Sequence, residues 1–110
     1  GYDRMNEMFD CSRIPTAVIA INAYAAAGVM RSVMQHGRRV PEDISVVSYD
    51  NTKITELLSP KLTSVDYDYE DFGQRLVETA IAAISGKAMP RIQLLTPELV
   101  VRESTAAVKE

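Results

Sequence analysis

The sequence predicts an α/β protein with a parallel sheet, and three observations lead to this fold class. Residues 16–21 (TAVIAI) and 44–49 (ISVVSY) are continuous apolar runs, as in strands that are buried on both faces. Residues 23–35 between them are rich in alanine and methionine, which favour helix. A strand–helix–strand unit of about 30 residues fits a right-handed crossover between parallel strands. We therefore expect three layers, α/β/α, with helices on both faces of the sheet.

The elements around this unit follow from local patterns. Apolar side chains recur at helical spacing over residues 2–9, which predicts a first helix. Gly37 is expected to end the helix at 23–35 in a left-handed conformation. Downstream of the second strand, the pattern predicts a short helix over residues 52–58 and a short strand over 62–65.

The longest predicted helix covers residues 69–85, and Gly86 is expected to end it. Its apolar residues recur at helical spacing and form one stripe: Phe72, Leu76, Val77, Ala80, Ile81 and Ile84. Two strands are predicted after it, over residues 92–95 and 98–101, with Pro97 between them. No internal repeat or low-complexity segment interrupts this order of elements.

Composition narrows the classes of function. The chain has 110 residues, of which 46% are hydrophobic, enough for one small globular domain. A net charge of −3 and a pI of about 5.1 argue against direct binding of nucleic acid, which usually needs a basic patch. Arg38 and Arg39 form the one basic cluster, and the nearby Glu42 and Asp43 offset it.

The sequence also indicates a compartment. Cys11 is the single cysteine, so no internal disulfide is possible, which fits a reducing environment. No apolar run is long enough to span a membrane, and the polar first residues do not resemble a signal peptide. A cytoplasmic location is therefore expected. Because the chain begins with Gly1, we expect it to be a piece of a longer protein.

The sequence contains no recognisable catalytic or metal-binding motif. His36 has no serine or cysteine partner at a known spacing, and phosphate-binding glycine loops are missing. The acidic run at 66–71 (DYDYED) lacks the spacing and glycine of a calcium loop, and suits the positive end of a helix dipole. We therefore expect a protein that is not an enzyme and has neither a cofactor nor a metal.

Two polar side chains follow the two long predicted strands. Asn22 comes after the first strand and Asp50 directly after the second. Ligands of open parallel sheets bind outside the carboxyl ends of the strands, and both ends lie at the same edge. An amide beside a carboxylate suits a ligand rich in hydroxyls. The alternatives are structural: Asn22 as a helix cap, and Asp50 with Asn51 as turn residues.

Three stretches together resemble the effector domain of the lactose/galactose repressor (LacI/GalR) family. They are IPTAVIAINAYAAAGVMRSVMQHGRRVPEDISVVSYDN, SPKLTSVDYDYEDFGQ and LLTPELVVREST, and the resemblance covers residues 15–105. Members are bacterial transcription regulators, usually dimeric. They join an N-terminal helix-turn-helix headpiece to a two-lobed domain like the periplasmic sugar-binding proteins, and a small molecule bound between the lobes changes operator affinity.

The resemblance implies that residues 1–110 are the C-terminal portion of the effector-binding and dimerisation domain, with a periplasmic-binding-protein-like (type I) fold. Residues 66–91 would belong to the other lobe, and the headpiece and most of the first lobe would lie outside the chain. The partners implied are a small-molecule effector, for which a sugar is the family default, a second copy of the chain, and operator DNA through the headpiece. No membrane partner is implied.

The resemblance also carries roles to individual positions. The implied effector contacts are Asn22, Asp50, Tyr69 and Phe72, and the implied dimer interface includes Ala27, Leu57 and Leu58. The structural alternatives are that the two aromatic residues are helix core and that the alanine-rich helix packs inside its own lobe.

Three positions depart from the family pattern. Ala23 and Asn51 replace the usual aspartates, which lowers the negative charge at this edge, and Ser48 replaces the usual glycine. These departures bear on the identity of the effector more than on the fold. The rival functions are a solute-binding protein for sugar transport, with the same two-lobed fold, and an enzyme of flavodoxin-like topology.

Overall fold

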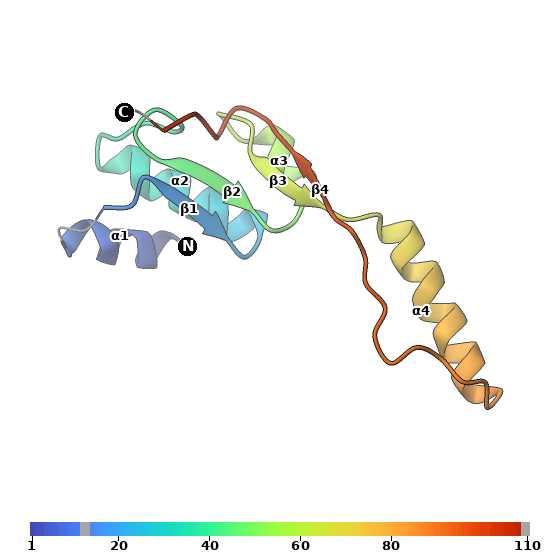
Figure 1. Cartoon of the computed structure of the whole chain (residues 1–110). Helices are drawn as coiled ribbons and strands as arrows, with labels where there is room; N and C mark the ends of the chain where they lie inside the picture. Colours follow the sequence, from blue (N-terminus) through green and yellow to red (C-terminus); the bar gives the residue numbers. More distant parts are fainter. Residues whose placement is uncertain (12–13, 109–110) are drawn as a thin grey trace. The chain divides into compact units, whose positions relative to one another are not determined.

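The computed structural model describes residues 1–11 and 14–108, which contain four helices and four strands (Figure 1). The chain divides into two compact units. The sheet unit consists of residues 1–66 and the chain from Leu99 onward, and the helix unit consists of residues 67–98. Among the helices of the described residues, none is long and apolar enough to cross a membrane.

The sheet has the strand order β1-β2-β3-β4 (Figure 1). Strands β1 (Ala17–Ala20) and β2 (Ser45–Ser48) pair in parallel, and β2 pairs in parallel with β3 (Thr63–Asp66). The last strand, β4 (Glu98–Val100), starts at the boundary between the units. The predicted fold class, α/β with a parallel sheet, is confirmed.

One face of the sheet is covered by α2 (Ala23–Gln35), which packs on β1 and β2. Helix α1 (Tyr2–Asp10) packs on α2, and α3 (Ile54–Leu57) is a single turn. The core between these elements is apolar and includes Met5, Ala20, Ala26, Met30, Val33, Ile44, Val46 and Leu62. The sequence predicts a helix layer on each face of the sheet. In the described residues, α2 forms the layer on this face.

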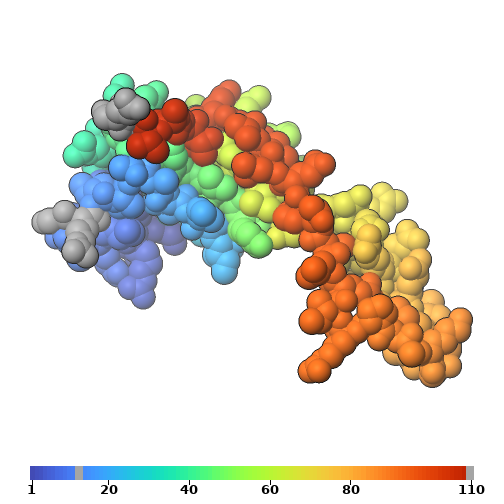
Figure 2. Space-filling model, in the orientation of Figure 1, coloured from blue at the N-terminus to red at the C-terminus, as the bar shows by residue number. Residues whose placement is uncertain are grey.

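The opposite face of the sheet is open. Ile19 on β1 points to this side, and 75% of its surface is exposed. A groove of about 500 Å³ runs along the face, and none of its lining residues lies in a helix. The last described residues, Thr105–Val108, line the same groove and lie beside the segment that leads into β1 (Figure 2).

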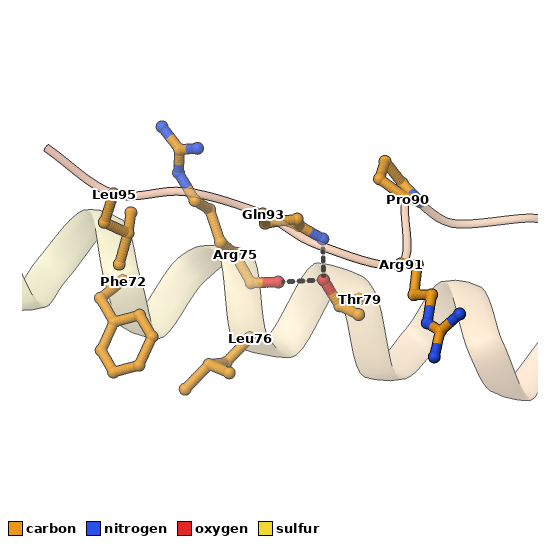
Figure 3. A pocket seen from close by; sticks show the side chains of 8 residues that line it. All are labelled: Phe72, Arg75, Leu76, Thr79, Pro90, Arg91, Gln93 and Leu95. Atoms are coloured by element: carbon orange, nitrogen blue, oxygen red, sulfur yellow. Dashed lines mark hydrogen bonds between the residues drawn. The ribbon is translucent and has the colours of Figure 1, made fainter.

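The helix unit is built on α4 (Tyr69–Ile84). Asp68 caps its start by accepting a hydrogen bond from the Asp71 N–H at 2.9 Å. The chain then returns along the helix, where Gln93 Nε2 donates to Thr79 Oγ1 at 2.9 Å (Figure 3). No side chain of α4 is buried, so its apolar stripe has no core in the described residues.

Most predicted elements are confirmed to within two residues, and the helix at 23–35 has the predicted bounds. Gly37 follows α2 with a φ of 68°, the left-handed conformation expected at a helix end. The strand predicted over residues 92–95 is wrong, because this segment has no strand structure. A strand needs a hydrogen-bonded neighbour, and the rest of the helix unit offers it a helix.

Candidate functional site

Asn22 lies between β1 and α2 and is the N-cap residue of the helix. Its backbone is extended, with φ −157° and ψ 170°, and its side-chain Oδ1 accepts a hydrogen bond from the Ala25 N–H at 2.8 Å. This bond satisfies one of the N–H groups that a helix leaves unpaired in its first turn. The structural alternative for Asn22, a helix cap, is therefore observed, and the side chain is half-buried.

Asp50 reaches the same helix end from the neighbouring strand. It follows β2 by two residues, and its Oδ1 accepts a hydrogen bond from the Ala23 N–H at 2.6 Å. A carboxylate at this position is also stabilised by the positive end of the helix dipole. The parallel crossover thus brings Asn22 and Asp50, 28 positions apart in the sequence, to one end of α2.

Each of the two side chains retains an unused polar group. The structure records no hydrogen bond from Asn22 Nδ2, or to the second carboxylate oxygen of Asp50, within residues 1–11 and 14–108. The pair therefore offers a donor and an acceptor at the same end of α2. A hydroxyl group both donates and accepts, so a ligand rich in hydroxyls matches this arrangement.

The turn that carries Asp50 is held by buried and half-buried polar groups. The Ser48 hydroxyl donates to the Asp50 carbonyl at 2.7 Å and lies 2.7 Å from the Ser64 hydroxyl on β3. On the other side, Arg102 Nη2 donates to Asn51 Oδ1 at 2.8 Å. Sequence reasoning missed Arg102, whose one visible signal is a lone cation inside the otherwise neutral run LVVR.

Tyr69 and Phe72 lie on α4, in the helix unit, whereas Asn22 and Asp50 lie in the sheet unit. Neither aromatic side chain is buried: 55% of Tyr69 and 40% of Phe72 are exposed. Phe72 lines a groove of about 240 Å³ between α4 and the returning chain, together with Leu76 and Leu95 (Figure 3). The predicted effector contacts and the structural alternative, helix core, both stay predictions for these two residues.

The three predicted interface residues lie on two elements of the sheet unit. Leu57, in α3, is 81% exposed, whereas Leu58 is half-buried and packs against the core. Ala27 on α2 is half-buried. The helix packs inside its own unit through Ala23 and Ala26, which are fully buried. The alanine-rich sequence therefore serves internal packing on one side, while Ala27 lies outside that buried set.

No group of three or more histidine, cysteine, aspartate or glutamate residues that suits a metal ion is found in the part of the chain that the structure describes. The ring of His36 stacks on Phe9, with centroids 4.1 Å apart, and its Nδ1 lies 2.9 Å from the Ser32 carbonyl oxygen. Cys11 is exposed and free. His36 thus packs the C-terminal end of α2 against α1.

Residues 1–105 match the family of periplasmic binding protein-like domains. The chain belongs to this family. The match includes both units, so the parallel sheet with its polar edge and the α4 segment are parts of one family domain.

The relatives of the chain within this family include transcriptional repressors. The lactose operon repressor of Escherichia coli is 36% identical over 107 residues, which are 97% of this chain and 30% of the repressor. The crystal structure of the lac repressor dimer, bound to operator and the anti-inducer ONPF, superposes with a TM-score of 0.90 at 35% identity. It covers 96% of this chain, which matches 37% of the repressor chain.

A further structure is the complex of the transcriptional regulator CelR with cellobiose. Its TM-score is 0.84 at 33% identity, over 94% of this chain and 32% of the CelR chain. The resemblance to the LacI/GalR family is therefore confirmed. The chain spans about a third of the length of the curated relatives it matches.

Proposed function

We propose that this chain is the effector-binding part of a bacterial transcriptional regulator that responds to a small molecule, and that the effector is a sugar. The observation that carries the proposal is the pair of polar side chains at the start of α2. Asn22 and Asp50 each fix one atom on the helix and leave a second polar atom for a ligand. The lactose operon repressor and the CelR–cellobiose complex, both relatives of the chain, support the sugar.

The second part of the proposal concerns the two lobes. Residues 66–91 belong to the other lobe of the full-length protein, where the apolar stripe of α4 from Leu76 onward packs on the sheet of that lobe. The division of the chain at residues 67–98 supports this assignment, as does the exposure of every apolar side chain in the stripe. Tyr69 and Phe72 then contact the effector from the opposite lobe to Asn22 and Asp50.

The regulatory mechanism follows from binding between lobes. A ligand shifts an equilibrium between open and closed lobes only if its contacts differ between the two states. Contacts from both lobes meet this condition, because one set is lost on opening. Coupling between effector and operator sites typically amounts to about 1–3 kcal/mol, which is a change in operator affinity of about 5–150-fold.

The remaining partners belong to the full-length protein. A homodimer forms through Ala27, Leu57 and Leu58, of which Leu57 is the most exposed. Operator DNA binds to an N-terminal headpiece that lies outside this chain. The full-length protein acts in the cytoplasm, and it uses neither a cofactor nor an enzymatic step. The lac repressor structure, a dimer bound to operator, supports both statements for this chain.

The test uses the full-length protein and its Asp50→Ala variant. Binding of cellobiose and lactose is measured by calorimetry, and binding to DNA fragments that the protein selects from the host genome is measured with and without sugar. We expect Asp50→Ala to weaken sugar binding and to abolish the sugar response while DNA binding persists. Glu42→Ala, at an exposed carboxylate of the sheet unit, is the matched control and should behave as wild type.

Two outcomes contradict the proposal. If Asp50→Ala and Glu42→Ala respond to sugar like the wild type, Asp50 is not an effector contact. If the full-length protein binds sugar and selects no DNA, the function is that of a solute-binding protein for sugar transport.

A further inference from the structure

Arg102 is a nearly buried cation with three partners in the sheet unit. Its side chain is 12% exposed. Nη1 donates to the Leu62 carbonyl at 2.7 Å, and Nη2 donates to Asn51 Oδ1 at 2.8 Å. Glu56 Oε1 lies 3.6 Å from Nη2. A charge that loses water is costly unless hydrogen bonds replace that water, so these contacts fix the guanidinium in one arrangement.

Asn51, the partner of Arg102, is the neighbour of Asp50 in the turn after β2. Its Oδ1 also lies 3.1 Å from the Thr55 hydroxyl, which makes a shorter hydrogen bond of 2.7 Å to the Thr52 carbonyl, so the amide oxygen lies between Arg102 and the region of α3. The Ser48 hydroxyl donates to the Asp50 carbonyl on the same, C-terminal side of Asp50, and on the N-terminal side the Tyr49 N–H donates to the Ala20 carbonyl at 2.9 Å. The backbone on both sides of the Asp50 side chain is therefore fixed, which directs the carboxylate to the Ala23 N–H.

We propose that Arg102 is a positioning residue for the effector site, an inference that rests on the proposed function of Asp50 as an effector contact. Arg102 acts through Asn51: it fixes the turn at residues 50–51, and the turn fixes the Asp50 carboxylate against α2. The chain re-enters the sheet unit at Leu99, so Arg102 also ties the re-entering segment to this turn.

The geometry requires arginine rather than any cation. The two acceptors, the backbone carbonyl of Leu62 just before β3 and the Asn51 amide oxygen, are met by two different nitrogens of one planar guanidinium. The ammonium group of a lysine is a single point of charge and cannot occupy both positions. Arg102→Lys therefore keeps the positive charge but loses the paired hydrogen bonds to Leu62 and Asn51. The variant separates the effect of these bonds on the turn from the effect of the charge.

The experiment reads the position of Asp50 without any ligand. The Ala23 N–H is bonded to Asp50, whereas the Ala25 N–H is bonded to Asn22, so the two amides report on the two side chains separately. Hydrogen exchange of both amides is measured by NMR in the full-length protein. In Arg102→Lys we expect exchange at Ala23 to be about tenfold faster and exchange at Ala25 to be unchanged.

Two further variants keep the test decisive if Arg102→Lys does not fold. Asn51→Ala removes the same link from its other end and should also accelerate exchange at Ala23. Asn51→Asp retains an acceptor for the guanidinium and should keep exchange at Ala23 slow. The matched control is Arg39→Lys, because Arg39 forms an exposed ion pair with Asp43 in the same unit.

The outcomes separate this inference from the function on which it rests. Unchanged exchange at Ala23 in Arg102→Lys and Asn51→Ala overturns the positioning role. An equal rise at Ala23 and Ala25 overturns it too, because α2 then loosens as a whole. Calorimetry with cellobiose and lactose follows: we expect about tenfold weaker binding in Arg102→Lys. If the wild type binds neither sugar, the sugar proposal fails while the exchange data still decide the role of Arg102.

Discussion

Replacing Asp50 by asparagine tests whether its carboxylate stabilises the start of α2. In the wild type, Asp50 Oδ1 lies 2.6 Å from the Ala23 nitrogen. The substitution keeps the shape of the side chain and an oxygen that can accept this hydrogen bond. It removes the charge. A hydrogen bond to a charged group contributes about 1.5–3 kcal/mol, against about 0.5–1.5 kcal/mol for a neutral pair. The loss of charge should therefore cost about 1 kcal/mol.

The helix dipole contributes to the same loss. A negative charge at a helix N-terminus stabilises by about 0.3–1 kcal/mol at an exposed site and up to about 2 kcal/mol at a partly buried one. Asp50 is half-buried, so the combined loss for Asp50→Asn should be about 1–2 kcal/mol. The hydrogen bond and the dipole describe overlapping electrostatics, so the two contributions are not added in full.

The assay is urea unfolding of the full-length protein without ligand, in low and in high salt. We expect a lower midpoint for Asp50→Asn with an unchanged dependence on urea, and a smaller difference from wild type in high salt, because salt screens a half-buried charge in part. Glu42→Gln, at an exposed carboxylate, should stay within about 0.5 kcal/mol of wild type. If Asp50→Asn is as stable as Glu42→Gln, the carboxylate does not support α2 and the reasoning is refuted.

Further predictions concern packing and assembly. Gly28→Ala should destabilise the protein by about 1–3 kcal/mol in thermal unfolding, because the added Cβ would lie 2.8 Å from the Tyr2 backbone nitrogen and push α1 from α2. Leu57→Lys should leave the far-UV circular dichroism unchanged and convert the dimer to monomer in sedimentation, whereas a dimer that survives contradicts the proposed interface.

The sheet unit was predictable where the signal is local. The alanine-rich run between two β-branched runs has one reading, a helix between parallel strands, and the bounds of α2 follow from Asn22 before it and Gly37 after it. The parallel crossover then places Asn22 and Asp50 at one edge without further information. Hydrogen bonds supplied the detail that the sequence does not contain, namely which N–H groups of α2 each side chain takes.

Other features depend on contacts that no short window of sequence contains. Arg102 and Asn51 are 51 positions apart, and nothing near either residue marks the pair. The segment 92–95 has a strand-like composition, but its neighbour in the described residues is α4. The open face of the sheet carries exposed apolar residues such as Ile19. Apolar composition reflects burial in the whole domain, whereas the described residues place a helix layer on the other face of the sheet.

The structural and functional readings of Asn22 and Asp50 support each other. In each side chain, one oxygen accepts a hydrogen bond from an N–H of α2, and this bond fixes the direction of the other polar atom before any ligand binds. A contact that is already ordered costs little entropy on binding. In the proposed two-lobed protein, more of the binding free energy is then available to favour one lobe arrangement over the other, which is the quantity that changes operator affinity. A helix cap is therefore a reason to expect a strong effector response from these two residues, rather than an alternative to one.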